Sequence, residues 1–182
     1  MLQQQLSKLR ARGAVFAGGE PELNDRVDEE TLAVLDVLKV RRPDGPMLAL
    51  YDQLDGVALH WTLPGVGSGG LAIPDAMKHA LRPGKDERSK PLEGVLWSDQ
   101  HDDARLRRMY IIDASALGDF ITYIPGDDRA YFIESGEIRA CKTTLAETIE
   151  LLVRFVGADS LREHLVHDDW RERIANDPAL WL

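Results

Sequence analysis

The densest cluster of residues that could do chemistry is Asp99-Gln100-His101-Asp102-Asp103. An imidazole beside carboxylates can bind a metal ion or carry protons. Neighbouring residues of one loop rarely surround an ion without ligands from distant segments, and the sequence identifies no such ligands. We therefore expect a solvated acidic loop that contacts a partner. The alternative is a small metal-dependent hydrolase that uses His101, Asp102 and Asp103.

Two further segments have the composition of ligand-binding loops. Residues 65–70 are rich in glycine but lack the Gly-Lys-Ser/Thr ending of a phosphate-binding loop. Gly126-Asp127-Asp128 offers two carboxylates of the kind that hold magnesium, but no third one can be identified. Because glycine and aspartate are also the usual turn formers, both segments are predicted to be turns between strands.

Histidines and the single cysteine complete the candidates. His164 and His167 are three residues apart on a predicted helix, so both imidazoles could lie on one face. Two ligands do not complete a zinc site, and the chain has no second cysteine and no His-Glu-x-x-His pattern. Cys141 is expected to be a small buried hydrophobe. A catalytic Cys–His pair stays open, because its members need not be close in sequence. We predict no metal and no cofactor.

The elements that must position these residues alternate between helical and extended patterns. Apolar residues three or four apart predict helices over 2–12, 28–39 and 47–54, with a turn or two at 74–81 and a connector over 13–24. Thr144-Leu145-Ala146-Glu147 is a capping box that begins a helix ended by Gly157. Asp159 is expected to cap a final helix or pair of helices.

Short apolar or alternating runs predict strands at 57–63, 71–73, 94–97, 109–113, 119–124, 130–134 and 137–141. The connections between the last four are too short for parallel crossovers. The sequence thus predicts an α+β fold with a single antiparallel sheet, mixed at most at its edge, of about five to six strands. N- and C-terminal helices pack on this sheet. Residues 1–27 are expected to form an N-terminal helix and connector, and residues 28–182 a single domain.

Composition narrows the class of protein. The chain has 182 residues and a formal net charge of 22 − 31 = −9, with a single cysteine. A negative field repels phosphate backbones, so we expect no nucleic-acid partner, whereas basic proteins are attracted. No secretory signal begins the sequence and no run of apolar residues is long enough for a membrane span. We expect a soluble cytoplasmic protein with no membrane partner.

The C-terminal segment Pro178-Ala179-Leu180-Trp181-Leu182 is apolar. Such a segment either folds back on its own domain or docks on another chain, because leaving it in water is unfavourable. We predict that it folds back. A homodimer through this tail stays open.

Two stretches, together with the order of elements over residues 28–156, resemble the SUKH superfamily of fungal cell-wall assembly regulators and bacterial toxin-immunity proteins. Leu48-Ala49-Leu50-Tyr51-Asp52-Gln53-Leu54-Asp55-Gly56, leading into Val57-Ala58-Leu59-His60-Trp61, is similar to the family's helix that ends in an Asn-Gly or Asp-Gly turn before the first strand. Residues 115–153 are similar to its hairpin and closing helix. The chain departs from the family at residues 42–46, where Leu-Pro is common.

The resemblance implies that residues 28–182 form a SUKH-like scaffold that binds proteins and does not catalyse. In bacterial members a sheet face and loops dock onto a toxin, commonly a basic nuclease, and neutralise it. An acidic chain would be complementary to such a partner. The expected partner-contacting residues share exposed strand or loop positions: His60, Thr62, Asp99, His101, Asp102, Asp103, Asp127 and Asp128.

Overall fold

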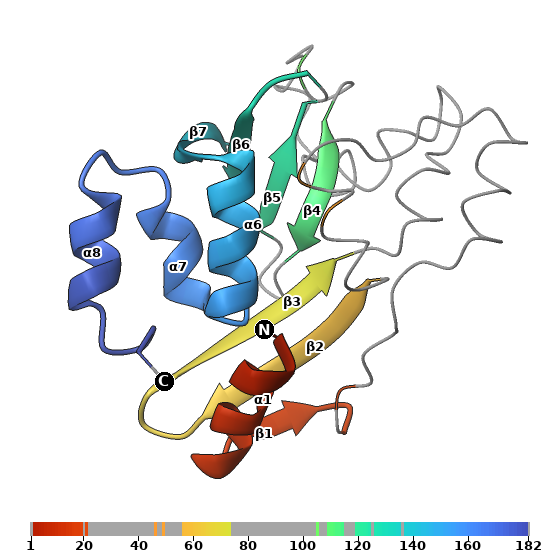
Figure 1. The fold of residues 1–182 in the computed structure, drawn as a ribbon, viewed down its shortest axis with the longest axis vertical. Coiled ribbons are helices and arrows are strands. Elements are labelled where there is room, and N and C mark those ends of the chain that lie inside the picture. The colour runs from red at the N-terminus through yellow and green to blue at the C-terminus, as the bar shows by residue number, and fades with distance from the viewer. Residues whose placement is uncertain are drawn as a thin grey trace, which may run out of the picture.

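The computed structural model describes residues 2–19, 21, 46, 49, 56–73, 105, 109–114, 119–124, 126–135 and 137–181. Their helices and strands follow in the order α1 (Leu2–Ala11), β1 (Val15–Ala17), β2 (Val57–Leu63), β3 (Gly67–Ile73), β4 (Tyr110–Ala114), β5 (Phe120–Tyr123), β6 (Arg129–Glu134), β7 (Glu137–Thr144), α6 (Leu145–Arg154), α7 (Asp159–His164) and α8 (Trp170–Asn176) (Figure 1). No helix among these residues has the length and apolar character needed to cross a membrane.

The predicted α+β class with antiparallel strands is confirmed, but the single sheet of five to six strands is wrong. The described strands form a three-stranded sheet in the order β1-β2-β3 and a four-stranded sheet in the order β4-β5-β6-β7. Every pairing within both sheets is antiparallel.

The free edge of β3 explains why the strands do not join into one sheet. In an antiparallel ladder alternate residues direct their N–H and C=O groups to opposite edges. Gly70 and Ala72 direct theirs away from β2. The Gly70 N–H donates to Gly157 O at 3.0 Å, and the Ala72 N–H donates to the carboxylate Oδ1 of Asp113 in β4 at 2.8 Å. Side chains and a helix corner therefore satisfy the edge that a neighbouring backbone would otherwise pair with.

A buried ion pair completes this junction. Arg162 of α7 donates from Nη2 to Gly70 O and to Asp113 Oδ2, both at 2.6 Å, and from Nε to the same carboxylate oxygen at 3.0 Å. Its Nη1 donates to Gly157 O at 3.0 Å. The exposed fractions of the Arg162 and Asp113 side chains are 1% and 0%. The charges are thus fully paired, and the guanidinium occupies the place of strand-to-strand hydrogen bonds.

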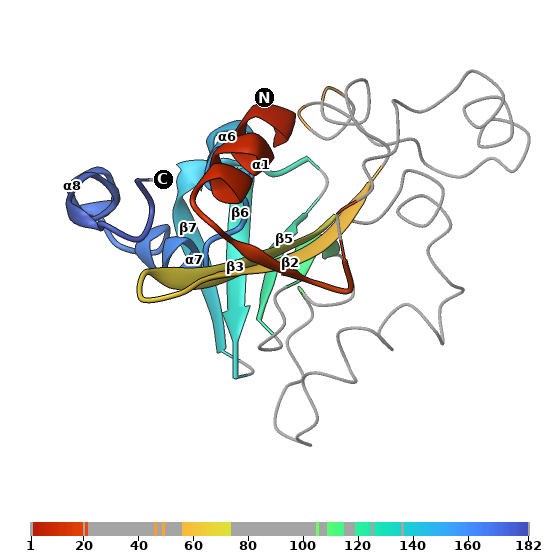
Figure 2. The same ribbon diagram turned by 90° about the horizontal axis from the view of Figure 1, so that it is seen from below.

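The main core lies between the sheets and the helices. Leu2, Leu6 and Leu9 of α1 are buried in the same apolar cluster as the inward residues of β2 and of α6. Figure 2 shows α1 and α6 on the same side of the β2–β3 hairpin. The Trp61 indole of β2 donates from Nε1 to Val156 O at 2.8 Å, which satisfies its one polar group inside the core.

The four-stranded sheet is apolar on both faces. All four residues of β5 are buried. Ile121 and Tyr123 belong to the main cluster, while Phe120 packs with Met109 and Ile133 in a second cluster. This two-sided burial explains why residues 119–124 form a nearly continuous apolar run in the sequence.

Several predicted boundaries hold. The first helix is confirmed, as are the strands around 57–63, 109–113, 119–124, 130–134 and 137–141, of which the last continues to Thr144. The capping box is confirmed as well. The Glu147 N–H donates to Thr144 Oγ1 at 3.2 Å, and the Thr144 N–H donates to Glu147 Oε2 at 2.9 Å. The C-terminal pair of helices is present, and the tail folds back on them.

Three local predictions are wrong. The connector over 13–24 contains the strand β1, which pairs with β2. Four of the six residues of the turn predicted over 65–70 belong to a strand, because β3 begins at Gly67. The N-cap of α7 is Ala158, which makes no side-chain cap, while Asp159 in the first turn accepts a hydrogen bond from Ser68 Oγ at 2.7 Å. The elements predicted at 28–39, 47–54, 74–81 and 94–97 lie outside the described residues.

Candidate binding surface

The alternation of β2 divides its residues between the core and an outer face. Leu59 and Trp61 point into the core, whereas Ala58, His60 and Thr62 point the other way. The strand registers add residues that lie opposite these three in β1 and β3. We call the resulting surface the outer face, formed by Val15, Ala17, Ala58, His60, Thr62, Ser68, Gly70 and Ala72.

Small neutral side chains dominate the outer face. Ala17, Ala58, Thr62 and Ser68 are exposed, and Val15 reaches 63% exposure. Because these side chains are short, they do not keep a partner away from the backbone of the strands. The outer face therefore has the shape of a platform and carries little charge.

His60 is the one ionisable group of the outer face. It is half-buried and lies over Gly70, its partner across the β2–β3 ladder. A Cβ atom at Gly70 would overlap His60 Nδ1. The missing side chain of Gly70 thus provides the space that the imidazole occupies.

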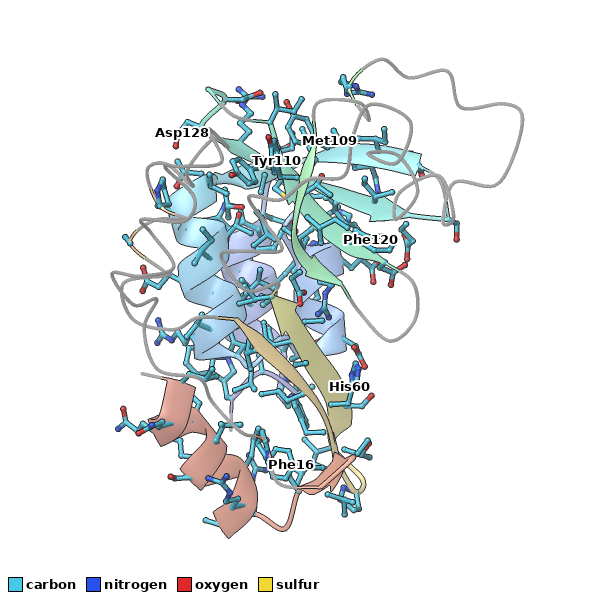
Figure 3. The ribbon with its side chains drawn as sticks, turned by 90° about the vertical axis from the view of Figure 1, so that its right-hand side faces the viewer. Phe16, His60, Met109, Tyr110, Phe120 and Asp128 are labelled. Carbon is cyan, nitrogen blue, oxygen red and sulfur yellow. The ribbon has the colours of Figure 1, made fainter. Side chains whose placement is uncertain are left out.

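The predicted acidic turn lies elsewhere. Asp128 and His60 are far apart in Figure 3, because Asp128 lies in the turn before β6 of the four-stranded sheet and His60 lies in β2 of the other sheet. The Tyr131 hydroxyl donates to Asp127 Oδ2 at 2.6 Å, and the Arg129 N–H donates to Asp127 Oδ1 at 3.1 Å. The hydrogen bond to Asp127, together with partial burial, raises the pKa of Tyr131 above its ordinary value. Asp127 therefore acts as the acceptor that shapes its turn.

A hollow of about 410 Å³ borders this turn. Asp127 and Asp128 line it together with Lys142 and the Cys141 edge of β7. Lys142 Nζ is already 2.8 Å from Asp168 Oδ1. Two acidic and two basic residues line the hollow, so its lining carries no net formal charge. The predicted contact residues thus divide into His60 and Thr62 on one surface and Asp127 and Asp128 on another. Asp99, His101, Asp102 and Asp103 lie outside the described residues.

The histidines and the cysteine of the C-terminal half have structural surroundings. α7 ends at His164, so His164 and His167 do not lie on one helix, which a shared helix face would require. His164 Nε2 lies 2.9 Å from Asp177 Oδ2. Burial raises the pKa of the Cys141 thiol to about 12, although the nearby Arg139 charge acts in the opposite direction. Across the described part of the chain no three acidic, histidine or cysteine side chains converge on a metal site.

A groove between α6 and α8 escaped the sequence analysis. It has a volume of about 350 Å³, and aromatic residues from three segments line it. Phe155 and Trp181 meet edge to face with ring centroids 5.6 Å apart. The Arg171 guanidinium lies over the Trp170 ring, 4.2 Å from the ring centroid. The aromatic residues near both ends of this helical region were a signal, but their convergence depends on how the helices pack.

Comparison of the chain with models of protein families, with curated proteins and with solved structures found no match.

Proposed function

We propose that this chain is a non-catalytic protein-binding domain whose contact surface is the outer face of β1–β2–β3. The observation that carries this proposal is the exposed platform of small neutral residues around His60. Side chains such as Ala58 and Thr62 lose little conformational entropy when a partner covers them. A surface of this kind can be buried by a protein without leaving charges desolvated and unpaired.

The charge of the chain supports a basic partner. Of the net −9, residues 20–55 account for 4 − 10 = −6. A basic protein would be drawn to such a chain, and a nucleic acid would be repelled. Nuclease toxins are basic because they hold nucleic acid. Together with the resemblance to SUKH proteins, this favours an immunity or regulatory protein that binds and neutralises a toxin in the cytoplasm.

The structural roles of three buried ionisable side chains also favour binding over catalysis. Asp113 and Arg162 neutralise each other inside the molecule. The Cys141 thiol keeps its proton far above neutral pH, so it is a poor nucleophile. Asp113, Arg162 and Cys141 therefore serve the architecture, and His60 is the one ionisable residue among those that form the outer face.

The proposal is tested with the products of genes that neighbour the gene of this protein. Each product is purified and titrated against the full chain by calorimetry, and nuclease-like products are assayed for inhibition. We expect one basic product to bind in a defined stoichiometry and to lose its activity. If none of them binds, the immunity function is wrong.

Two matched variants locate the surface. Thr62→Arg adds a long charged side chain to the outer face and should weaken binding about tenfold or more. Gln4→Arg makes a comparable change on exposed α1, and it should leave the affinity unchanged. Equal affinities for Thr62→Arg and the wild type would assign the contact to another surface. Circular dichroism confirms that both variants are folded.

A further inference from the structure

We infer that the groove between α6 and α8 is the interface of a homodimer, in which the exposed part of each Trp181, held in place by its own chain, packs against the groove of the second copy. The groove provides both parts of such a contact. Trp181 lines it and is nevertheless 49% exposed, which makes it the one exposed aromatic side chain of large size among the described residues. The exposed Trp181 side chain and the groove that would receive it therefore belong to the same surface patch, as a two-fold symmetric interface requires.

One end of the groove carries an ion pair beside Trp170, and the other end carries the exposed Trp181. At one end Arg171 Nη2 binds Glu147 Oε1 at 3.1 Å beside the Trp170 ring. At the other end Trp181 donates from Nε1 to Ile174 O at 2.8 Å and packs on Phe155. A two-fold axis across the groove exchanges the ends. It brings the exposed indole of each copy to the Trp170 end of the other.

Charge along α6 supports the same arrangement. Glu150 and Arg154 are four residues apart, and both line the groove. If the axis passes between these two residues, reversal of the helix direction places Glu150 of one copy opposite Arg154 of the other, whose guanidinium also lies over its own Trp181 ring at 5.7 Å from the centroid. Two acidic and two basic side chains line the groove in all, counting Glu147 and Arg171. This patch is thus complementary to its own inverted copy.

The overall charge makes the neutrality of the groove significant. Two chains of net charge −9 repel each other over most of their surfaces. A patch with equal numbers of both signs is a place where two copies can meet without this cost. A strongly basic partner would repel the two arginines of the groove, and a strongly acidic partner would repel its two glutamates. The second copy is therefore the occupant that the groove fits.

Sedimentation velocity of the full chain over concentrations from about 1 µM to about 1 mM tests the inference. We expect the mass to rise from 20.4 kDa towards twice that value. Ala175→Arg, at an exposed position that lines the groove, should raise the dissociation constant about tenfold or more. Asn176→Arg is the matched control, because Asn176 is exposed on the same helix but does not line the groove.

A charge exchange tests the orientation. Glu150→Arg alone faces Arg154 of the second copy with a like charge and should weaken the dimer. The double variant Glu150→Arg, Arg154→Glu restores opposite charges and should regain part of the affinity. A wild type that stays monomeric over the whole range, or a dimer indifferent to Ala175→Arg, would overturn the inference. So would a double variant no better than Glu150→Arg. Thr62→Arg should dimerise normally, which separates this result from partner binding.

Discussion

Arg162 is a cation that is almost completely shielded from water. Its guanidinium donates to the Asp113 carboxylate and to two backbone carbonyls, Gly70 O and Gly157 O, and its Nη1 also lies 3.5 Å from Asp159 Oδ1. Removing two charges from water costs several kcal/mol, and only good geometry with further hydrogen bonds offsets that cost. The five donors of arginine arranged in a fixed fork meet this need, whereas lysine could not satisfy the same acceptors.

Loss of the Arg162 charge alone should therefore reduce the stability of the fold more than loss of both Arg162 and Asp113 charges. Arg162→Met leaves the Asp113 carboxylate buried and unpaired, and we expect it to reduce the free energy of unfolding by about 3–5 kcal/mol. Asp113→Leu, Arg162→Met removes both charges and should recover part of that loss. Recovery stays partial because the Gly70 carbonyl and the Ala72 N–H lose their partners. Urea unfolding of the wild type, of Arg162→Met and Asp113→Leu alone and of the double variant measures these losses. A double variant as unstable as the sum of its single changes would show that the charges do not interact.

The Cys141 thiol gives a pH-dependent prediction. Its pKa is raised to about 12 from a reference of 9.0, so the folded state holds the proton more tightly than the unfolded state. The associated stabilisation is fully present below pH 9 and is lost as the pH rises towards 12. We expect a thiol reagent at pH 8 to react only after denaturant is added. Fast labelling of the native protein would contradict the burial of this side chain.

At the scale of elements, the corner between α6 and α7 sets how closely the helices approach β3. Val156 has φ = 51°, a left-handed conformation that is rare for a β-branched residue. Its carbonyl accepts the Trp61 indole hydrogen bond, and its side chain is fully buried. Gly157 follows with φ = 59° and touches the Gly70 carbonyl. Packing against the sheet therefore maintains a backbone that is unfavourable by itself.

A matched pair of glycine substitutions separates the close approach from the backbone angle. Gly65→Ala places a side chain at φ = 75° with open space around it, and it should cost about 1 kcal/mol. Gly157→Ala also places a side chain at a positive φ, 59°, but its Cβ would in addition overlap Gly70 O, which is backbone. We expect a loss of stability several times larger. Equal losses in thermal unfolding would mean that the corner can move away from β3.

The strands with clear alternation or short turns could be predicted because those signals are local. Residues 57–63 alternate strictly, and Thr144 with Glu147 forms a contiguous capping motif. The start of β3 could not be predicted, because its glycines are typical of a loop. A Cβ at Gly69 would lie 2.7 Å from Trp61 Cζ2, so this glycine is there for close packing. The division into two sheets was also beyond the sequence, since Asp113 and Arg162 are 49 residues apart and follow no period.

For the whole molecule, the C-terminal segment ties distant elements together. Asp177 pairs with His164 of α7, and the carbonyl of Trp181 accepts from Arg12 Nη1 at 3.3 Å. Leu180 between them is buried. The tail therefore links the end of α1 to the C-terminal helices. Two of the predicted contact residues, His60 and Thr62, could be placed on one surface from β2 alone, but their distance from Asp127 and Asp128 depends on this overall packing.

Acid should loosen the C-terminal tie. Burial alone would raise the pKa of Asp177, but the Ser160 hydroxyl, the His164 imidazole and the Ala179 N–H favour the carboxylate more strongly. The pKa therefore lies below its reference of 3.8, and the stabilisation is present above pH 3.8 and lost as the pH falls through the folded-state value. Asp177→Asn should lower the melting temperature at pH 7, and this difference should shrink in acid. A difference that stays constant with pH would exclude the carboxylate as its source.

The neutral outer face has a kinetic consequence when it is set on so acidic a chain. Long-range attraction by the net charge of −9 governs how fast a basic protein arrives, and salt screens it. Release depends on short-range contacts with residues such as Ala58 and Thr62, which salt hardly affects. Rising ionic strength should therefore slow the encounter several-fold while the lifetime of the complex stays nearly constant.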